Sequence, residues 1–335
     1  MTRARDVADT QDNLGGAVPP FLAGKNKIIN GNFSIWQRGT SSTSTGYSTA
    51  DRWSCGTDAT ATFSQQTFTP GAAPVAGYEG QYFMRLAKNS GGSYVDLRQF
   101  IEDVRTFAGQ TVTLSFWAKC GSGTESLEPY YSQDFGSGGS GGVSNSVTAQ
   151  TITTSWARYS FTFTLPSVSG KTIGANSFLL IYAVRSISSS TARTIDVWGV
   201  QLETGSVATP FTPAGGGSQQ AELALCQRYY VRYPQSGAQD MDYGIGLFTS
   251  TTLYKQTIPL AVPMRVAPTT LDVSGLRVYD PISTTNYTSA SSINSTNSTP
   301  NVALITWTHA TGAFTAGRSG YYNTASGYIG LSAEL

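Results

Sequence analysis

The sequence predicts an all-β protein: an antiparallel jelly-roll β-sandwich followed by a smaller β-rich carboxy-terminal domain. Between Ile28 and Phe211, short runs of alternating apolar and polar residues recur and are separated by turn-forming residues. Only 12% of the 335 residues are charged, 36 are glycine, and aromatic residues make up 12%. Disordered chains have few aromatic residues, so this composition indicates a folded core. Regularly spaced strands with little helical pattern favour a sandwich or jelly roll.

Alternation is clearest in residues 111–118, where apolar side chains occupy every second position, as is typical of a half-buried strand. Residues 159–165 repeat this pattern, and residues 194–203 close the series of strands. Residues 178–184 are continuously apolar and predict a strand covered on both faces. Residues 95–107 show helix-like apolar spacing, so one short helix is predicted as an alternative there.

Glycine and proline divide the chain into parts. Residues 1–25 contain few apolar side chains and several Gly and Pro interruptions, which predicts an extended amino-terminal arm. The jelly roll then covers residues 26–211, and residues 212–218 form a glycine-rich linker. Residues 219–335 make the carboxy-terminal domain, which starts with a short helix because residues 219–230 lack Gly and Pro.

Two segments are too rich in small polar residues to predict regular elements. Residues 121–146 read as a long Gly/Ser loop that also holds acidic and aromatic residues. Loops of this length are either functional or mobile. Residues 289–299 are a low-complexity Ser/Asn/Thr run, which is also predicted as a loop.

Charge and composition exclude several function classes. The formal net charge of +1 gives no field for collecting phosphates, so we expect no nucleic-acid binding. The three cysteines, Cys55, Cys120 and Cys226, are far apart and form no CxxC pair, so they suggest neither a zinc site nor a redox motif. His309 is the only histidine, which removes most routes to a His-based zinc site or a Ser-His-Asp triad. No apolar run approaches the roughly 18 residues of a membrane span. We therefore predict no membrane insertion and no export signal.

Several motifs resemble phage structural proteins that carry a carbohydrate-binding-module-like jelly roll. The resemblance covers about residues 26 to 232, and residues 263–268 show a weaker match. The residues that carry it in the jelly roll are Asn26–Phe33, Trp36–Thr40, Ala50–Trp53, Leu114–Lys119, Trp156 and Asp196–Gly205. Residues 209–211 and 222–230 resemble the junction to the carboxy-terminal domain of phage tail-fibre or virion fibre proteins.

This resemblance implies a virion protein of a tailed phage, on the tail or capsid surface, made in the host cytoplasm without a signal peptide. Fibres of this kind are usually homotrimers, so the chain itself is one expected partner. Another virion protein is expected to receive the arm of residues 1–25. Related modules often hold a structural calcium near the first and last strands, and Asn30 or Asn32 with Asp196 match those positions. Calcium prefers several carboxylates, and only one of these residues is charged.

A host surface glycan is the further expected partner. Sugars are held by aromatic faces with flanking amide and carboxylate groups. Trp117 lies on the polar side of an alternating strand, and the loop of residues 121–146 presents two tyrosines among acidic residues. The candidate glycan contacts are Trp117, Glu125, Glu128, Tyr130, Tyr131 and Asp134. As alternatives, a neighbouring segment or subunit covers Trp117, and the tyrosines pin the loop.

These observations lead to two function hypotheses, and neither is enzymatic. The chain is either a tail fibre or receptor-binding protein that adheres to glycan, or a capsid or tail decoration with a purely structural sandwich. A polysaccharide depolymerase, the minor alternative, needs two positioned carboxylates. The sequence offers Glu125 with Glu128, or Glu102 with Asp103, but no P-loop, GxSxG elbow or metal triad.

Overall fold

The computed structural model describes residues 25–75, 78–187, 191–234, 241–268, 270–287, 291–293, 297–309 and 314–335. The predicted arm of residues 1–25 therefore lies almost entirely outside the described residues. The chain forms two compact units, which divide between Leu223 and Ala224 rather than within the predicted linker of residues 212–218.

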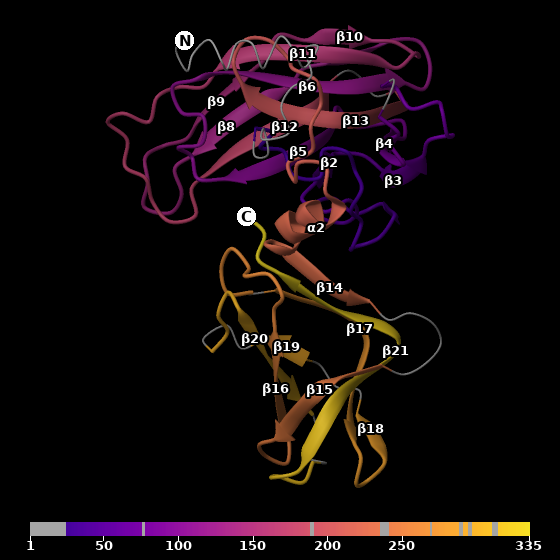
Figure 1. The fold of residues 1–335 in the computed structure, drawn as a ribbon, viewed down its shortest axis with the longest axis vertical. Coiled ribbons are helices and arrows are strands. Elements are labelled where there is room, and N and C mark those ends of the chain that lie inside the picture. The colour runs from indigo at the N-terminus through magenta and orange to yellow at the C-terminus, as the bar shows by residue number, and fades with distance from the viewer. Residues whose placement is uncertain are drawn as a thin grey trace, which may run out of the picture. The chain divides into compact units, whose positions relative to one another are not determined.

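The first unit is a sandwich of two antiparallel sheets (Figure 1). The six-stranded sheet runs in the order β1 (Ser41–Ser42), β3 (Ala61–Thr67), β4 (Tyr82–Lys88), β13 (Arg193–Thr204), β6 (Thr111–Cys120) and β11 (Ala157–Thr164). The five-stranded sheet runs in the order β2 (Ser54–Thr57), β5 (Val95–Glu102), β12 (Phe178–Ser186), β8 (Tyr130–Asp134) and β9 (Val143–Ser146). A small pair joins β7 (Glu125–Leu127) to β10 (Gln150–Ile152). The all-β class is confirmed.

Alternation along the strands places the core between the two sheets. In β6 the apolar residues Val112, Leu114 and Phe116 are fully buried, and the ring of Phe116 stacks on Phe161 of β11 at 5.6 Å. Strand β12 contributes Leu179 and other residues from the opposite sheet to the same core. Burial of these side chains contributes about 1.5–3 kcal/mol each before the conformational entropy of folding is counted.

The sequence predictions for residues 121–146 and for residues 95–107 were wrong. Residues 121–146 are not one long loop, because β7, β8 and β9 form within them. Strand β8 is short and pairs in register with β12, whose apolar residues supply the burial that the Gly/Ser-rich segment lacks. The short helix considered for residues 95–107 does not form, because residues 95–102 are the strand β5 and a turn follows them. The helix-like spacing arises because Phe100, on the face away from the core, packs on Phe178 at 5.1 Å.

Several of the residues that carry the resemblance belong to the internal scaffold of the sandwich. Asn26 and Asn30 are buried, and their side-chain amides bond to backbone groups of distant segments. Trp53 is fully buried and its indole N–H donates to the carbonyl of Asn30 at 2.9 Å. Buried polar groups need such partners. These buried residues therefore help to fix the architecture of the sandwich.

In the second unit, the strands form one antiparallel sheet with its own core. Its order is β18 (Thr285–Tyr287), β17 (Thr270–Asp280), β21 (Ser319–Ser332), β15 (Met241–Phe248), β16 (Leu253–Pro259), β20 (Val302–Thr308) and β19 (Ser291–Ile293), and β14 (Tyr230–Pro234) also pairs with β21. The core is aromatic, with Tyr254, Trp307 and Tyr322 buried together. Strand β19 lies inside residues 289–299, so the loop prediction was wrong for that part.

The predicted short helix is present as α2 (Gln219–Gln227). It begins after Ser218, whose hydroxyl accepts the N–H of Ala221, as an N-cap residue does. Among the residues that the structure describes, no helix is both long and apolar enough to cross a membrane.

Candidate functional site on the outer face of the five-stranded sheet

A row of large side chains crosses the outer face of the five-stranded sheet. Arg98 of β5 pairs with Tyr182 of β12, and Tyr182 pairs with Tyr130 of β8. Residues paired across adjacent strands point to the same face of a sheet. Their neighbours Leu97, Ile181 and Tyr131 are buried in the core, so this row points outward. Three strands thus present one arginine and two tyrosines side by side.

A second row lies beside the first. Asp96 of β5 pairs with Gly56 of β2 on one side and with Arg185 of β12 on the other. Gly56 is needed there because a Cβ on it would lie 2.6 and 2.7 Å from the two carboxylate oxygens of Asp96. The missing side chain of Gly56 therefore makes room for the carboxylate of Asp96.

The two rows line an open hollow of about 300 Å³. Its lining residues are Tyr94, Asp96, Arg98, Tyr130, Tyr182 and Arg185. The rings of Tyr130 and Tyr182 meet edge to face at 5.3 Å. The guanidinium of Arg98 lies 5.2 Å from the ring centre of Tyr182, and that of Arg185 lies 5.2 Å from the ring centre of Tyr130. These cation–π and ring contacts hold the side chains in place without filling the hollow.

Polar contacts hold part of each guanidinium, and Arg98 Nε also donates to the hydroxyl of Ser54 at 3.4 Å. Arg185 Nη1 donates to Glu128 at 2.9 Å, and Arg98 Nη1 donates to the hydroxyl of Tyr182 at 3.1 Å. Arg98 Nη1 also lies 3.8 Å from Asp96 Oδ1. The arginine side chains remain 25% and 28% exposed, so their other ends are accessible.

Asp96 is the unusual group of the site. It is 2% exposed, and among the described residues its Oδ1 accepts no hydrogen bond. Burial raises the pKa of its carboxyl to about 6, and the positive charges of Arg98 and Arg185 offset only part of that rise. Asp96 is therefore mostly ionised at neutral pH and mostly protonated near pH 5.

The structure divides the predicted glycan contacts. Tyr130 lies in the hollow, and Glu128 lies at its edge through Arg185. Tyr131 is buried and stacks on Phe163 at 5.3 Å, because successive residues of β8 point to opposite faces. Glu125 is buried, accepts the hydroxyl of Ser186 and pairs with Arg193, and Asp134 accepts the N–H of Gly136 in its own turn. None of the last three lines the hollow.

Trp117 lies on the outer face of the six-stranded sheet. Its ring lies 5.6 Å from Trp198 and 6.4 Å from Phe211, and the guanidinium of Arg158 lies 4.6 Å above it. Phe211 belongs to the segment after β13, so a neighbouring segment packs on Trp117. Close packing also requires Gly199, where a Cβ would lie 2.8 Å from the Trp117 ring and where φ is +66°.

The residues matched to a calcium site are engaged with protein groups. Asp196 pairs with Arg85 through two hydrogen bonds, at 2.7 and 2.8 Å, and with Lys119. The amide of Asn30 bonds to backbone groups, and Asn32 Oδ1 accepts the hydroxyl of Ser34. In the described part of the chain, no three His, Cys, Asp or Glu residues are grouped as metal ligands. The oxygens of these residues do not fit a calcium ion, which needs six to eight oxygen ligands.

The carboxylate pairs considered for a hydrolase are also engaged. Glu125 and Glu128 are paired with different arginines, Arg193 and Arg185. Asp103 pairs with the exposed Arg105.

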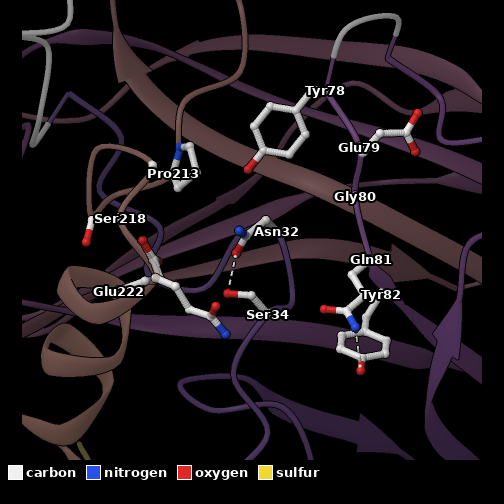
Figure 2. Close-up of a pocket in the computed structure, with 12 residues that line it drawn as sticks. Asn32, Ser34, Tyr78, Glu79, Gly80, Gln81, Tyr82, Pro213, Ser218 and Glu222 are labelled. Atoms are coloured by element: carbon white, nitrogen blue, oxygen red, sulfur yellow. Dashed lines mark hydrogen bonds between the residues drawn. The ribbon is translucent and has the colours of Figure 1, made fainter. Parts of the chain in front are cut away.

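A second, smaller hollow of about 140 Å³ lies between the start of β4 and residues 213–222 (Figure 2). Tyr78 and Tyr82 line it, and Asn32 and Ser34 bond to each other within it. Glu222 is buried there and accepts the N–H groups of Asn30 and Gly215. Burial raises the pKa of Glu222. These bonds join segments of the first unit, so we assign Glu222 a scaffold role.

Sequence reasoning missed most of the hollow: Tyr94, Asp96, Arg98, Tyr182 and Arg185. The first three belong to or adjoin a segment predicted as a helix, and Tyr182 lies in an apolar run predicted to be covered on both faces. Alternation of Asp96 and Arg98 with the buried Val95 and Leu97 is the signal that identifies the outer face once the segment is recognised as a strand.

No known protein family and no curated protein matches this chain. Solved structures of similar fold include the CBM22-1 xylan-binding domain from Paenibacillus barcinonensis Xyn10C, at 12% identity over 50% of this chain and 94% of that chain, with a TM-score of 0.32. A family 11 carbohydrate-binding module from Clostridium thermocellum is 12% identical over 52% of this chain and 99% of that one, with a TM-score of 0.32. The enzymatically active domain of bacteriophage CBA120 tailspike protein 4 is 15% identical over 56% of this chain, with a TM-score of 0.33, but the match spans only 22% of the tailspike chain.

Proposed function

We propose that the first unit binds glycan through the outer face of its five-stranded sheet. The observation that carries the proposal is the row of Arg98, Tyr182 and Tyr130 along an open hollow. A sugar ring has apolar C–H faces and a rim of hydroxyls. Tyrosine offers an apolar ring face with a polar tip, and arginine and aspartate supply hydrogen-bond partners for the hydroxyls.

The side chains of the site are also preorganised for binding. Each large side chain in the row already contacts another, through the Tyr130–Tyr182 edge contact and the two arginine–ring contacts. Binding then orders few new rotamers, which saves about 0.5–1.5 kcal/mol for each side chain that is already fixed.

The proposed activity is binding without turnover. Glycoside hydrolysis ordinarily uses two carboxylates that flank the scissile bond. In the described residues, Asp96 is the one carboxylate that lines the hollow, and Glu128 at its edge is paired with Arg185.

We propose that the whole chain acts in a phage virion as a tail fibre or receptor-binding protein. The resemblance of residues 26–232 to such proteins supports this role. In a homotrimer, three weak sites would act together on a repetitive host glycan and raise the overall affinity. The arm of residues 1–25 would dock on another virion protein.

A second candidate is a purely structural virion sandwich. It is favoured by the finding that the residues carrying the resemblance, such as Asn26, Asn30 and Trp53, are buried scaffold residues. A structural sandwich needs the same scaffold but has no use for the hollow.

A glycan array of bacterial surface oligosaccharides, probed with the full-length protein, separates the two candidates. We expect binding to a restricted set of glycans, reduced roughly 30-fold or more by Tyr130→Ala or Tyr182→Ala, as for the central anchor of an interface. Tyr82→Ala is the matched control because Tyr82 lines the other hollow. No binding to any glycan by the folded protein, or equal loss in all three variants, would contradict the proposed function.

A further inference from the structure

We propose that the glycan carries carboxylate groups, that Arg98 and Arg185 hold one of them, and that Asp96 makes this binding stronger in acidic medium. This inference rests on the proposed function. It adds the chemical class of the ligand and a form of regulation by pH at the same site.

The first support is the state of the two guanidinium groups. Each is anchored through Nη1, Arg98 to Tyr182 and Arg185 to Glu128, and Arg98 Nε also donates to the hydroxyl of Ser54 at 3.4 Å. Within the described residues, the Nη2 groups of both arginines make no hydrogen bond. Both side chains line the hollow. A planar guanidinium with uncommitted donors matches a planar carboxylate, and two of them supply more donors than neutral hydroxyls require.

The second support is the charge balance around Asp96. The positive groups that face it are Arg98 on its own strand and Arg185 on β12. The phenols of Tyr94, Tyr130 and Tyr182 line the same hollow, and β2 contributes Gly56 beside Asp96 and, on its core side, the buried thiol of Cys55, whose pKa is raised by burial so that it stays uncharged. Glu128 compensates Arg185 at the edge. With Asp96 ionised, two carboxylates balance two guanidinium groups, and no net charge remains to attract an acidic sugar.

Protonation of Asp96 changes this balance. Its carboxyl is buried and one oxygen accepts no hydrogen bond among the described residues, so the charged form is poorly stabilised. An incoming sugar carboxylate places a second negative charge close to it, which favours the protonated form further. A uronate is a carboxylate with a pKa near that of an ordinary α-carboxyl, about 3.5, and so remains ionised near pH 5. The loss of the Asp96 charge then leaves a net positive hollow around an anionic ligand.

The experiment is titration calorimetry on the full-length protein with matched probes. The probes are tetramers of galacturonate, glucuronate and mannuronate, each paired with its carboxyl-reduced neutral counterpart, and one sulfated tetramer. At least one uronate tetramer should bind about tenfold or more tightly than its reduced counterpart. Its affinity should rise about tenfold between about pH 7.5 and about pH 5, with net proton uptake seen as a buffer-dependent enthalpy.

Three variants test the roles of the residues. Asp96→Asn should bind the uronate at neutral pH as tightly as the wild type does near pH 5, and should lose the pH dependence. Arg98→Lys keeps the positive charge but loses the planar guanidinium with its several fixed N–H donors. It should therefore reduce the preference for uronate over the neutral tetramer. Arg105→Gln is the matched control, since this exposed arginine pairs with Asp103 outside the hollow. Circular dichroism of each variant checks the fold.

The outcomes separate this inference from the proposed function. If neutral tetramers or other neutral glycans bind as tightly as the uronates and Tyr130→Ala abolishes that binding, the carboxylate inference is wrong and glycan binding stands. If the sulfated tetramer is preferred, the ligand anion is not a carboxylate. If uronate binding is independent of pH, or Asp96→Asn keeps its pH dependence, the role of Asp96 is wrong. If no glycan binds, both proposals fail.

Discussion

Both outer faces of the sandwich carry arginine side chains over aromatic rings, but the rings are covered on one face and border an open hollow on the other. On the six-stranded sheet, Arg158 lies over Trp117, and the aromatic rings of Trp198 and Phe211 pack around it. On the five-stranded sheet, Arg98 and Arg185 lie over Tyr182 and Tyr130 beside a hollow of about 300 Å³.

The difference lies in the segments that adjoin the strands of each sheet. After β13, the segment around Thr209 is tied to Glu203 and Gln201 by hydrogen bonds, which brings Phe211 onto the aromatic cluster. Tyr78 packs on the same cluster from the segment before β4. An aromatic residue on the outer side of a strand therefore indicates a binding surface only where no returning segment covers it.

The largest expected effect tests the covered face. Trp198 is fully buried among Phe68, Tyr78, Trp117 and Phe211. Trp198→Ala should reduce the free energy of unfolding of the first unit by about 3–5 kcal/mol. Denaturant unfolding followed by tryptophan fluorescence measures this. A change below about 1 kcal/mol would show that the aromatic cluster is not a packed layer.

The next effect concerns Asp96 and the pH dependence of stability. Its folded-state pKa of about 6 lies above the unfolded value near 3.9, so the folded state holds the proton more tightly. The free energy of unfolding should therefore fall as pH rises from about 4 to about 6, by about 3 kcal/mol from this group.

The test is the difference between the wild type and Asp96→Asn, measured by denaturant unfolding across that window. This difference removes the contributions of other groups, such as Glu222, whose pKa is also raised by burial. Parallel curves for the two proteins would contradict the assignment of a raised pKa to Asp96.

Substitutions on the outer face of the five-stranded sheet should change the affinity for glycan more than the free energy of unfolding. Tyr182 is only partly buried, so Tyr182→Phe should keep the ring contact with Tyr130 and change stability little. It removes the hydroxyl that accepts from Arg98 Nη1, and should weaken glycan binding about fivefold to tenfold. Surface plasmon resonance with the best array glycan measures the loss. Unchanged affinity would show that the fixed position of Arg98 does not matter.

The smallest expected effect on glycan binding, no change at all, comes from the covered face. Trp117→Phe keeps an aromatic ring under Arg158 and should cost about 1–2 kcal/mol of stability. Glycan binding should stay unchanged, because Trp117 does not line the hollow. A loss of affinity in a folded Trp117→Phe variant would show that Trp117 contributes to glycan binding.

The sequence predicted much of the architecture but little of the site. Alternation in residues 111–118 and 159–165 identified β6 and β11, because both strands have one face in the core and one outside. The motifs near Asn30 and Trp53 were informative for the same reason, since buried hydrogen-bonding residues are dictated by the fold. The residues of the hollow face outward and carry no comparable signal in the sequence.

The rest of the site depends on pairing between distant strands. Asp96 and Arg185 are far apart in the chain and meet only because β5 and β12 are adjacent in register. Tyr130 was found because it stood out in a Gly/Ser-rich segment, whereas Tyr131 next to it had the same signal and faces the core. Without the register, the sequence does not show which of two adjacent tyrosines points outward.

The most direct test of glycan binding at the hollow is residue-level footprinting of aromatic side chains, with and without a saturating glycan selected on the array. Oxidative labelling followed by peptide mass spectrometry reports the exposure of each ring. Binding through the outer face of the five-stranded sheet should protect Tyr130 and Tyr182 and leave the labelling of Trp117 and Tyr82 unchanged. Protection of Trp117 or Tyr82, with Tyr130 and Tyr182 still labelled as in the free protein, would contradict it.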